Sequence, residues 1–418
     1  MSLAFWDLLL PRLGLGARSR LTRTERYRRS AAAFRILAIQ MGGVLIKVGQ
    51  FLSTRVDVLP PEIISELSNL QDEVPPASFA DIRRAAEADL GTPLSEKFDQ
   101  FEETPLAAAS LGQAHRARLK SGEFQDVVVK VQRPNIEAII ATDLAALRTV
   151  GNWLRRYPPI RRRADVPALL DEFIRILYQE IDYLNEGHNA ETFAANFKDQ
   201  VGVRVPHIIW THTTRHVLTL ENVWAIKITD YQAITAAGIS LADVASRLLD
   251  TYLKQIFEDS FFHADPHPGN LFIRPLTREP GEENVSWQLT FVDFGMVGHV
   301  PANLRDGLRE LLIGVGTQDA SRVVKSYQTL GVLLPTADLL LLEKAEAKLF
   351  EQFWGKNMTE LSHIDPGEVR EFLGEFRELL YALPFQVPHD IIYLGRAVAI
   401  LSGMCTGLDP SFNVWDHL

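Results

Sequence analysis

Cysteine is almost absent from this sequence of 418 residues, because Cys405 is the only one. A single cysteine excludes an internal disulfide, and no set of cysteines and histidines has the spacing of a structural zinc site. We therefore expect Cys405 to be a buried, unreactive thiol. The scarcity of cysteine also fits a reducing, cytoplasmic compartment.

Long apolar segments are scarce as well. The N-terminus lacks the short apolar core and the small-residue cleavage site of a secretory signal. The one candidate for a transmembrane span, residues 391–408, is interrupted by Arg396. We interpret this segment as a buried core helix, so any contact with a membrane is expected to be peripheral.

Positively charged residues are outnumbered: the sequence has 43 lysines and arginines and 53 aspartates and glutamates, which gives a net charge of −10. This balance argues against a general nucleic-acid binder, which would normally be basic. Residues 1–30 differ, because seven arginines and two acidic residues give them a charge of +5 (7 − 2), after apolar residues that include Phe5 and Trp6. Such a segment suits the surface of an anionic bilayer, and a solvated basic tail is the alternative.

The residues that are present have the profile of a soluble globular protein, with 46% hydrophobic and 23% charged residues. Their periodicity predicts roughly a hundred mostly helical residues, then a small strand-containing lobe, then a helical lobe. The expected fold class is therefore α+β and two-lobed. Helices are expected at residues 31–56, 62–70, 79–89, 134–150, 166–197 and 240–262 and from 303 onward, and strands at 114–119, 126–131, 217–223, 271–273 and 287–292.

The strongest chemical signal is the segment His-Ala-Asp-Pro-His-Pro-Gly-Asn at residues 263–270, followed by Asp-Phe-Gly at residues 293–295. In phosphoryl transfer one carboxylate accepts or orients the proton of the attacking hydroxyl, while an amide oxygen and a second carboxylate hold divalent metal. This spacing predicts Asp265 as the base or water-orienting group, and Asn270 and Asp293 as metal ligands. The two histidines are expected to brace the loop, and a transition-metal site with Asp265 is the alternative.

Lys130 lies in the predicted strand Val-Val-Val-Lys-Val, from which a lysine can reach nucleotide phosphates. Such a lysine needs a carboxylate partner on a nearby helix. The candidates are Glu180, Asp182 and Glu186, and the sequence alone does not choose among them. A solvated acidic face is the alternative interpretation of these residues.

The segment before the first of these strands departs from ordinary kinases, which cover the phosphates with a glycine-rich loop. Here residues 105–113 read Pro-Leu-Ala-Ala-Ala-Ser-Leu-Gly-Gln. Alanine is less permissive than glycine, so this loop is expected to hold phosphates differently. Farther upstream, Lys47 and Gln50 share one face of the first predicted helix, a pattern that by itself is typical of an amphipathic helix.

With these motifs in order, the sequence resembles the UbiB family of atypical kinases, the aarF-domain-containing proteins linked to quinone and isoprenoid-lipid metabolism. The resemblance covers nearly everything from residue 42 to residue 413. It rests on Lys-Val-Gly-Gln at 47–50, Leu-Ser-Thr-Arg at 52–55, Leu-Gln-Asp at 70–72, the alanine-rich loop, Glu-Ile-Asp at 180–182, the two motifs around Asp265 and Asp293, and Gly-Leu-Asp-Pro at 407–410.

The resemblance implies a protein-kinase-like fold in which a helical extension packs over the active site. The implied domains are a basic segment (1–30), the extension (31–104), a small nucleotide-binding lobe (105–224) and a helical catalytic lobe (225–418). ATP or ADP and Mg²⁺ are the implied cofactors. Lipid-stimulated ATP hydrolysis, or phosphorylation of a small substrate, is the implied activity, with lipid-biosynthesis enzymes as partners.

The resemblance also assigns roles to single residues. Lys47, Gln50 and Asp182 become regulatory candidates, and Lys130 with Glu180 or Glu186 becomes catalytic. Further nucleotide-binding candidates are Ala107, Ala108, Ala109, Ser110 and Glu221. Ala225 departs from the family, which usually has glycine there.

Two other functions fit parts of this pattern. A small-molecule kinase of the aminoglycoside or choline type shares the His-x-Asp-x-x-x-x-Asn loop, although the extension that carries Lys47 and Gln50 speaks against it. A non-catalytic scaffold that binds nucleotide and assembles lipid-modifying enzymes is the second, and the intact acidic residues speak against it. The phosphoryl acceptor and the oligomeric state do not follow from the sequence.

Overall fold

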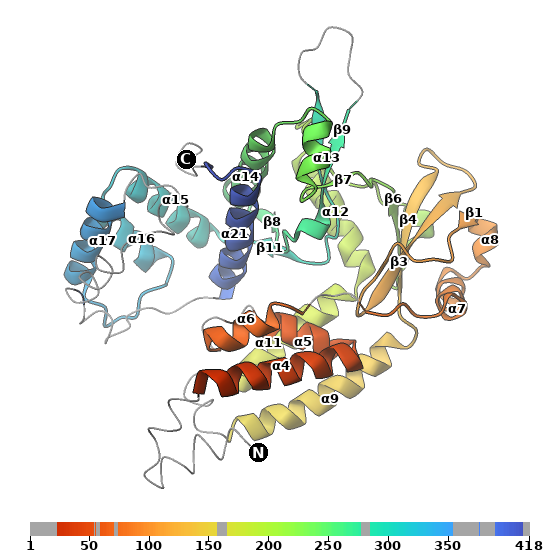
Figure 1. The fold of residues 1–418 in the computed structure, drawn as a ribbon, viewed down its shortest axis with the longest axis horizontal. Helices are drawn as coiled ribbons and strands as arrows, with labels where there is room; N and C mark the ends of the chain where they lie inside the picture. Colours follow the sequence, from red (N-terminus) through yellow and green to blue (C-terminus); the bar gives the residue numbers. More distant parts are fainter. Residues whose placement is uncertain are drawn as a thin grey trace. The chain divides into compact units, whose positions relative to one another are not determined.

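The computed structural model describes residues 23–53, 55, 59–70, 74–156, 165–276, 285–353, 376 and 389–412. The chain forms two compact units, each drawn in Figure 1. The first unit contains the residues up to Gly187 together with His207–Asn222, and the second contains His188–Pro206 together with the chain from Val223 onward. Residues 1–22 of the predicted basic segment, and Gln71 and Asp72 of a predicted motif, lie outside the described residues.

The first unit begins with helices. The single helix expected at residues 31–56 is wrong, because Gly42 and Gly43 have φ values of 66° and 56°, which an α-helix cannot accommodate. The helix expected at 79–89 is confirmed, and the one expected at 62–70 is present but ends at Leu67. The helices of this unit are α4 (Arg23–Met41), α5 (Val44–Ser53), α6 (Pro61–Leu67), α7 (Phe79–Leu90), α8 (Leu94–Lys97), α9 (Ile136–Leu154), α11 (Val166–Glu180) and the first turn of α12 (Tyr183–Asn196).

The helix expected at residues 166–197 is also two helices, with Ile181 and Asp182 between α11 and α12. The Asp182 carboxylate accepts a hydrogen bond from the backbone N–H of Asn185 at 3.2 Å. This contact caps the first turn of α12, as aspartate often does at this position. The carbonyl of Ile181 in turn accepts a hydrogen bond from the side chain of Gln132.

An antiparallel sheet forms the rest of the first unit. Its strand order is β1-β3-β4-β6, with β2 paired to β3. The strands expected at 114–119 and 126–131 are confirmed, and they pair as an antiparallel hairpin. Val127, Val129 and Val131 of β4 pack in one core cluster with Ile82 and Ala86 of α7. The strands are β1 (Phe98–Phe101), β2 (Ala107–Ala108), β3 (Gly112–Leu119), β4 (Asp126–Gln132) and β6 (Val217–Glu221).

The second unit surrounds a sheet of order β5-β10-β9-β7 and a strand pair β11-β8. The expected strands at 271–273 and 287–292 are confirmed, but the expected helix at 240–262 ends at Phe257, and its last residues belong to β8. The strands are β5 (Val203–Arg204), β7 (Ile226–Lys227), β8 (Phe261–His263), β9 (Leu271–Pro275), β10 (Trp287–Phe291) and β11 (Val297–His299). The helices are α13 (Tyr231–Ala236), α14 (Leu241–Phe257), α15 (Ala302–Gly316), α16 (Ala320–Thr329), α17 (Leu339–Phe353) and α21 (His389–Leu408).

The last of these helices confirms the expected core segment at 391–408. Ala397, Leu401 and Cys405 of α21 are buried. Burial raises the pKa of the Cys405 thiol to about 12, which agrees with an unreactive thiol. Within the described part of the chain, no helix has both the length and the hydropathy that a membrane span requires.

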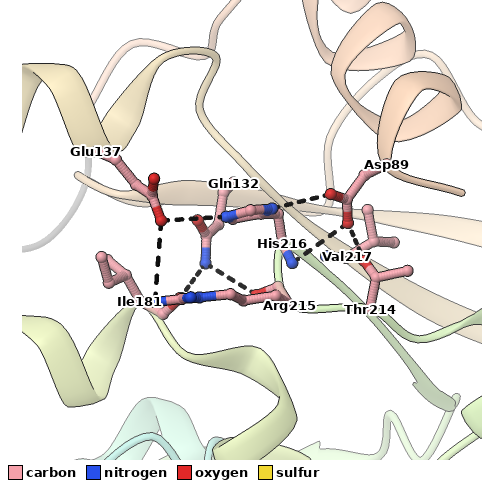
Figure 2. A network of polar contacts seen from close by, with 8 residues as sticks. All are labelled: Asp89, Gln132, Glu137, Ile181, Thr214, Arg215, His216 and Val217. Carbon is pink, nitrogen blue, oxygen red and sulfur yellow. Dashed lines mark hydrogen bonds and ion pairs between the residues drawn. The ribbon is translucent and has the colours of Figure 1, made fainter.

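A polar network ties α7 and α9 to the start of β6 in the first unit, as Figure 2 shows. Nδ1 of His216 lies 2.9 Å from Oδ1 of Asp89, and its Nε2 lies 3.5 Å from Oε1 of Glu137. Partial burial alone would lower the pKa of His216, but the two carboxylates outweigh this effect and raise it above 6.5. Burial would raise the pKa of Asp89, but hydrogen bonds from Thr214 and His216 lower it below 3.8.

This network predicts a pH-dependent contribution to stability. Because the pKa of His216 is raised in the folded state, its contribution is complete below about 6.5 and is lost as the pH rises through the folded-state value. We expect the difference in unfolding free energy between the wild type and His216→Asn to be larger near about pH 5.5 than near about pH 8.5. Urea titrations at both pH values measure it, and a difference that does not change with pH would contradict the assignment.

Candidate active site

Lys130 lies on β4 between two neighbouring strands, opposite Ala114 of β3 and Leu218 of β6. Its Nζ lies 2.6 Å from Oε1 of Glu186 on α12. The Glu186 side chain is 6% exposed and that of Lys130 is 20% exposed, so the pair is largely shielded from water. Of the three acidic candidates, the structure therefore pairs Glu186 with Lys130.

Glu180 has a different partner. It forms an ion pair with Lys47 of α5, and the two side chains are 22% and 14% exposed. On the same helix, the Gln50 amide donates to the carbonyl of Leu70 at 3.4 Å. The two residues of the Lys-x-Gly-Gln motif thus join α5 to the end of α11 and to the segment after α6.

The alanine-rich loop is part of the sheet rather than an open loop. Ala107 and Ala108 form β2 against β3, and the N–H of Ala109 donates to the carbonyl of Gly112 at 2.8 Å. The Arg133 side chain donates to the carbonyl of Ala109 at 3.1 Å, which further fixes the turn. Ser110, within the turn, is buried. The loop therefore has a defined backbone without glycines at residues 107–110.

Gly112 ends this turn at a point of close approach. A Cβ at this position would lie 2.6 Å from the hydroxyl of Tyr183 and 2.9 Å from the carbonyl of Val131. Only glycine fits there without displacement. Glu221, the remaining predicted nucleotide contact, ends β6, and its N–H donates to the carbonyl of His207 at 2.8 Å.

In the second unit, Asp265 follows β8 and Asn270 ends the short 3₁₀ turn η3 (Pro268–Asn270). The Asn270 side-chain nitrogen donates to the Asp265 backbone carbonyl at 3.3 Å, so Oδ1 is the side-chain atom of Asn270 that a metal ion would take as a ligand. The N–H of Val292 donates to the carbonyl of Asn270 at 3.0 Å. The loops that carry Asn270 and Asp293 are therefore neighbours.

Asp293 has a φ of 66°, which is uncommon for a residue other than glycine. Such backbone strain persists where the surroundings fix it, and it occurs often at functional sites. Phe294 is buried against Phe193, and its carbonyl accepts a hydrogen bond from Asn189 at 3.0 Å. These contacts hold the Asp-Phe-Gly turn in place.

The donor set of Asn270 and Asp293 fits Mg²⁺, which commonly takes one or two protein oxygens and completes its shell with water and phosphate oxygens. The transition-metal alternative finds no support, since the described residues contain no cluster of three or more His, Cys, Asp or Glu side chains that could hold a metal ion. The backbone N–H of His263 donates to Oε1 of Gln255 at 2.9 Å, and its ring Nε2 lies 3.2 Å from the carbonyl of Val292.

Sequence reasoning missed one residue of this site. Nη2 of Arg396 on α21 lies 2.8 Å from Oδ1 of Asp265. The sequence presented Arg396 only as an interruption of an apolar segment, and 131 residues separate it from its partner. No short-range pattern connects two residues at such a distance in the chain.

A sheet lysine paired to a helix glutamate, together with an Asp-x-x-x-x-Asn loop and an Asp-Phe-Gly turn, defines a protein-kinase-like protein. The structure of Rv3197 of Mycobacterium tuberculosis, solved as a complex with erythromycin, superposes with a TM-score of 0.59 at 20% identity and covers 94% of this chain and 95% of that one. The expected kinase-like α+β class is confirmed.

The ABC1 atypical kinase-like domain matches residues 69–327, so the chain belongs to this family, and the expected UbiB membership is confirmed. A Synechocystis protein described as uncharacterized is 39% identical over 93% of this chain and 64% of its own length. ACTIVITY OF BC1 COMPLEX KINASE 8, chloroplastic, of Arabidopsis thaliana is 38% identical over 90% of this chain and 51% of its own length. The chain thus spans roughly half to two thirds of these relatives.

The Lys130–Glu186 pair leads to a prediction about stability. Replacing Glu186 with Gln removes the negative charge that lies 2.6 Å from the shielded Lys130 ammonium. We therefore expect the unfolding free energy to fall by about 3 kcal/mol. Glu191→Gln is the matched control, because that side chain lies on the same helix and is 52% exposed; it should change stability by less than about 0.5 kcal/mol. Urea unfolding compares the variants, and equal effects would contradict the importance of the pair.

Proposed function

We propose that this protein binds ATP with Mg²⁺ and acts as an atypical kinase or ATPase in support of quinone or isoprenoid-lipid metabolism. The observation that carries the proposal is the 2.6 Å pair of Lys130 and Glu186. In kinases a strand lysine paired in this way reaches the nucleotide phosphates. Membership of an atypical kinase-like family supports the same activity.

In this proposal the residues of the second unit perform the chemistry. Asp265 orients the attacking water or hydroxyl and takes up its proton. Asn270 and Asp293 bind Mg²⁺, which when bound neutralises charge on the phosphate oxygens. The strained backbone of Asp293 and the backbone hydrogen bond between Val292 and Asn270 support this pairing of ligands.

In this proposal, residues of the first unit bind the nucleotide and regulate the activity. The backbone of Ala107–Ser110 and the end of β6 at Glu221 contact the nucleotide. Lys47, Gln50 and Asp182 control the activity: Lys47 holds Glu180, while Asp182 caps the helix that carries Glu186. Glu180, Asp182 and Glu186 lie within the segment 180–186, so a change in either contact would alter the position of Glu186 relative to Lys130.

We further propose that residues 1–30 contact an anionic membrane surface from the cytoplasm, because seven arginines follow an apolar, tryptophan-containing start. Lipid-biosynthesis enzymes are then natural partners at that surface. The proposal needs no membrane span.

Asp293→Asn tests the metal site. The substitution keeps the size of the side chain and removes a charge, so we expect Mg²⁺-dependent binding of ATP to weaken by at least about tenfold. Isothermal titration with and without Mg²⁺ measures the change. Asp306→Asn, an exposed aspartate of α15, is the control. Wild-type affinity in Asp293→Asn would refute the assignment.

Liposomes test the membrane contact. We expect anionic vesicles to bind the full chain and to raise its ATP turnover, and neutral vesicles to do neither, because the attraction is electrostatic. A chain that lacks residues 1–30 should keep its basal turnover and lose the response. Co-sedimentation and phosphate release measure the two effects, and a truncated chain that still responds fully would refute this role.

A further inference from the structure

The cationic partner of the Asp265 carboxylate is Arg396 of α21, which lies 131 residues farther along the chain. Nη2 of Arg396 lies 2.8 Å from Oδ1 of Asp265. The side chains are 29% and 28% exposed, so water screens this pair less than it screens a surface pair. Among the described residues, no other side chain forms a hydrogen bond or ion pair with this carboxylate.

The core of the unit fixes both partners. Ala264 and Ala397, the chain neighbours of Asp265 and Arg396, are buried in one hydrophobic cluster with Phe262 and Leu394. Close-packed interiors resist displacement, so the backbones on the two sides of the ion pair keep their separation. The contact is therefore part of the packed structure rather than a chance encounter of two long side chains.

The other contacts of the loop leave the direction of the carboxylate undetermined. The N–H of His267 and the amide of Asn270 both donate to the backbone carbonyl of Asp265, at 2.7 Å and 3.3 Å. They fix the backbone but not the side-chain torsions. The contact with Arg396 restrains these torsions. Since Arg396 binds Oδ1, Oδ2 is the carboxylate oxygen that can face a substrate.

We infer that Arg396 is a positioning residue, which holds Asp265 through Oδ1 so that Oδ2 meets the nucleophile. The inference rests on the proposed function. As the nucleophile's oxygen bonds to the γ-phosphorus, the bond from that phosphorus to the bridging oxygen of ADP breaks, and the nucleophile's proton passes to Oδ2. A misplacement of about 1 Å at such a group costs about 100-fold in rate.

Steady-state ATP hydrolysis by the full chain tests this role. We expect Arg396→Gln to lower kcat by about 10- to 100-fold with little change in the KM for ATP. Arg396→Lys, which keeps the charge but not the planar fork, should retain part of kcat. In Arg396→Ala, millimolar guanidinium should restore part of kcat, which it would not do for a purely structural defect.

Arg322→Gln is the matched control, because Arg322 of α16 also forms an ion pair, with Glu310 at 2.8 Å, in the same unit. It should leave kcat unchanged. An unchanged kcat in Arg396→Gln overturns the inference. An increased kcat also overturns it, since Arg396 would then restrain the site. Loss of activity with no rescue by lysine or guanidinium reduces Arg396 to a structural residue.

Hydrogen exchange separates this inference from the proposed function. If the wild type hydrolyses no ATP under any condition, the proposed function fails, but the tether can still be judged. The N–H of His267 donates to the carbonyl of Asp265, and a loop opening that frees this amide must also break the Arg396 contact in the wild type. The amide should therefore exchange faster in Arg396→Gln than in Arg322→Gln. Equal exchange in the two variants would show that Arg396 does not hold this loop.

Discussion

The break between α11 and α12 is the constraint on which much of the first unit depends. The side chain of Gln132, at the end of β4, donates to the carbonyls of Ile181 and Arg215 (Figure 2). The N–H of Tyr183 donates to the carbonyl of Arg215 as well, at 3.2 Å. These contacts tie the end of one strand, the start of another and the start of a helix at one point. Because these contacts fix where α12 begins, they also fix the direction in which its side chain Glu186 faces. That direction brings Glu186 to Lys130.

The same break positions the alanine-rich turn. Tyr183, the first residue of α12, is buried, and its hydroxyl lies where a side chain at residue 112 would be. Glu180, one turn earlier on α11, holds Lys47. The strand lysine, the turn and the Lys-x-Gly-Gln helix are thus linked through the seven consecutive residues 180–186, so a shift of one would be transmitted to the others by packing.

The sequence predicted those features that depend on periodicity or on local spacing. The β3–β4 hairpin and the core helix α21 have strong patterns, and the kinase-like class followed from motifs whose order is fixed. Helix ends were harder, because Gly42–Gly43 and Asp182 act through backbone conformation and capping rather than through hydrophobic pattern. Strands of two residues such as β5 and β7 are too short to have a period. The Arg396 contact could not be found at all, since a chain separation of 131 residues leaves no local trace.

The lone thiol of the chain has a consequence for how its motions can be followed. Cys405 is buried on α21, the helix that also presents Arg396, and its thiol donates to the carbonyl of Ala245. A thiol with a pKa of about 12 is almost wholly protonated near neutral pH and reacts slowly with alkylating reagents. The rate at which Cys405 is alkylated therefore reports how often α21 separates from the residues packed around it. No cysteine has to be introduced for this measurement.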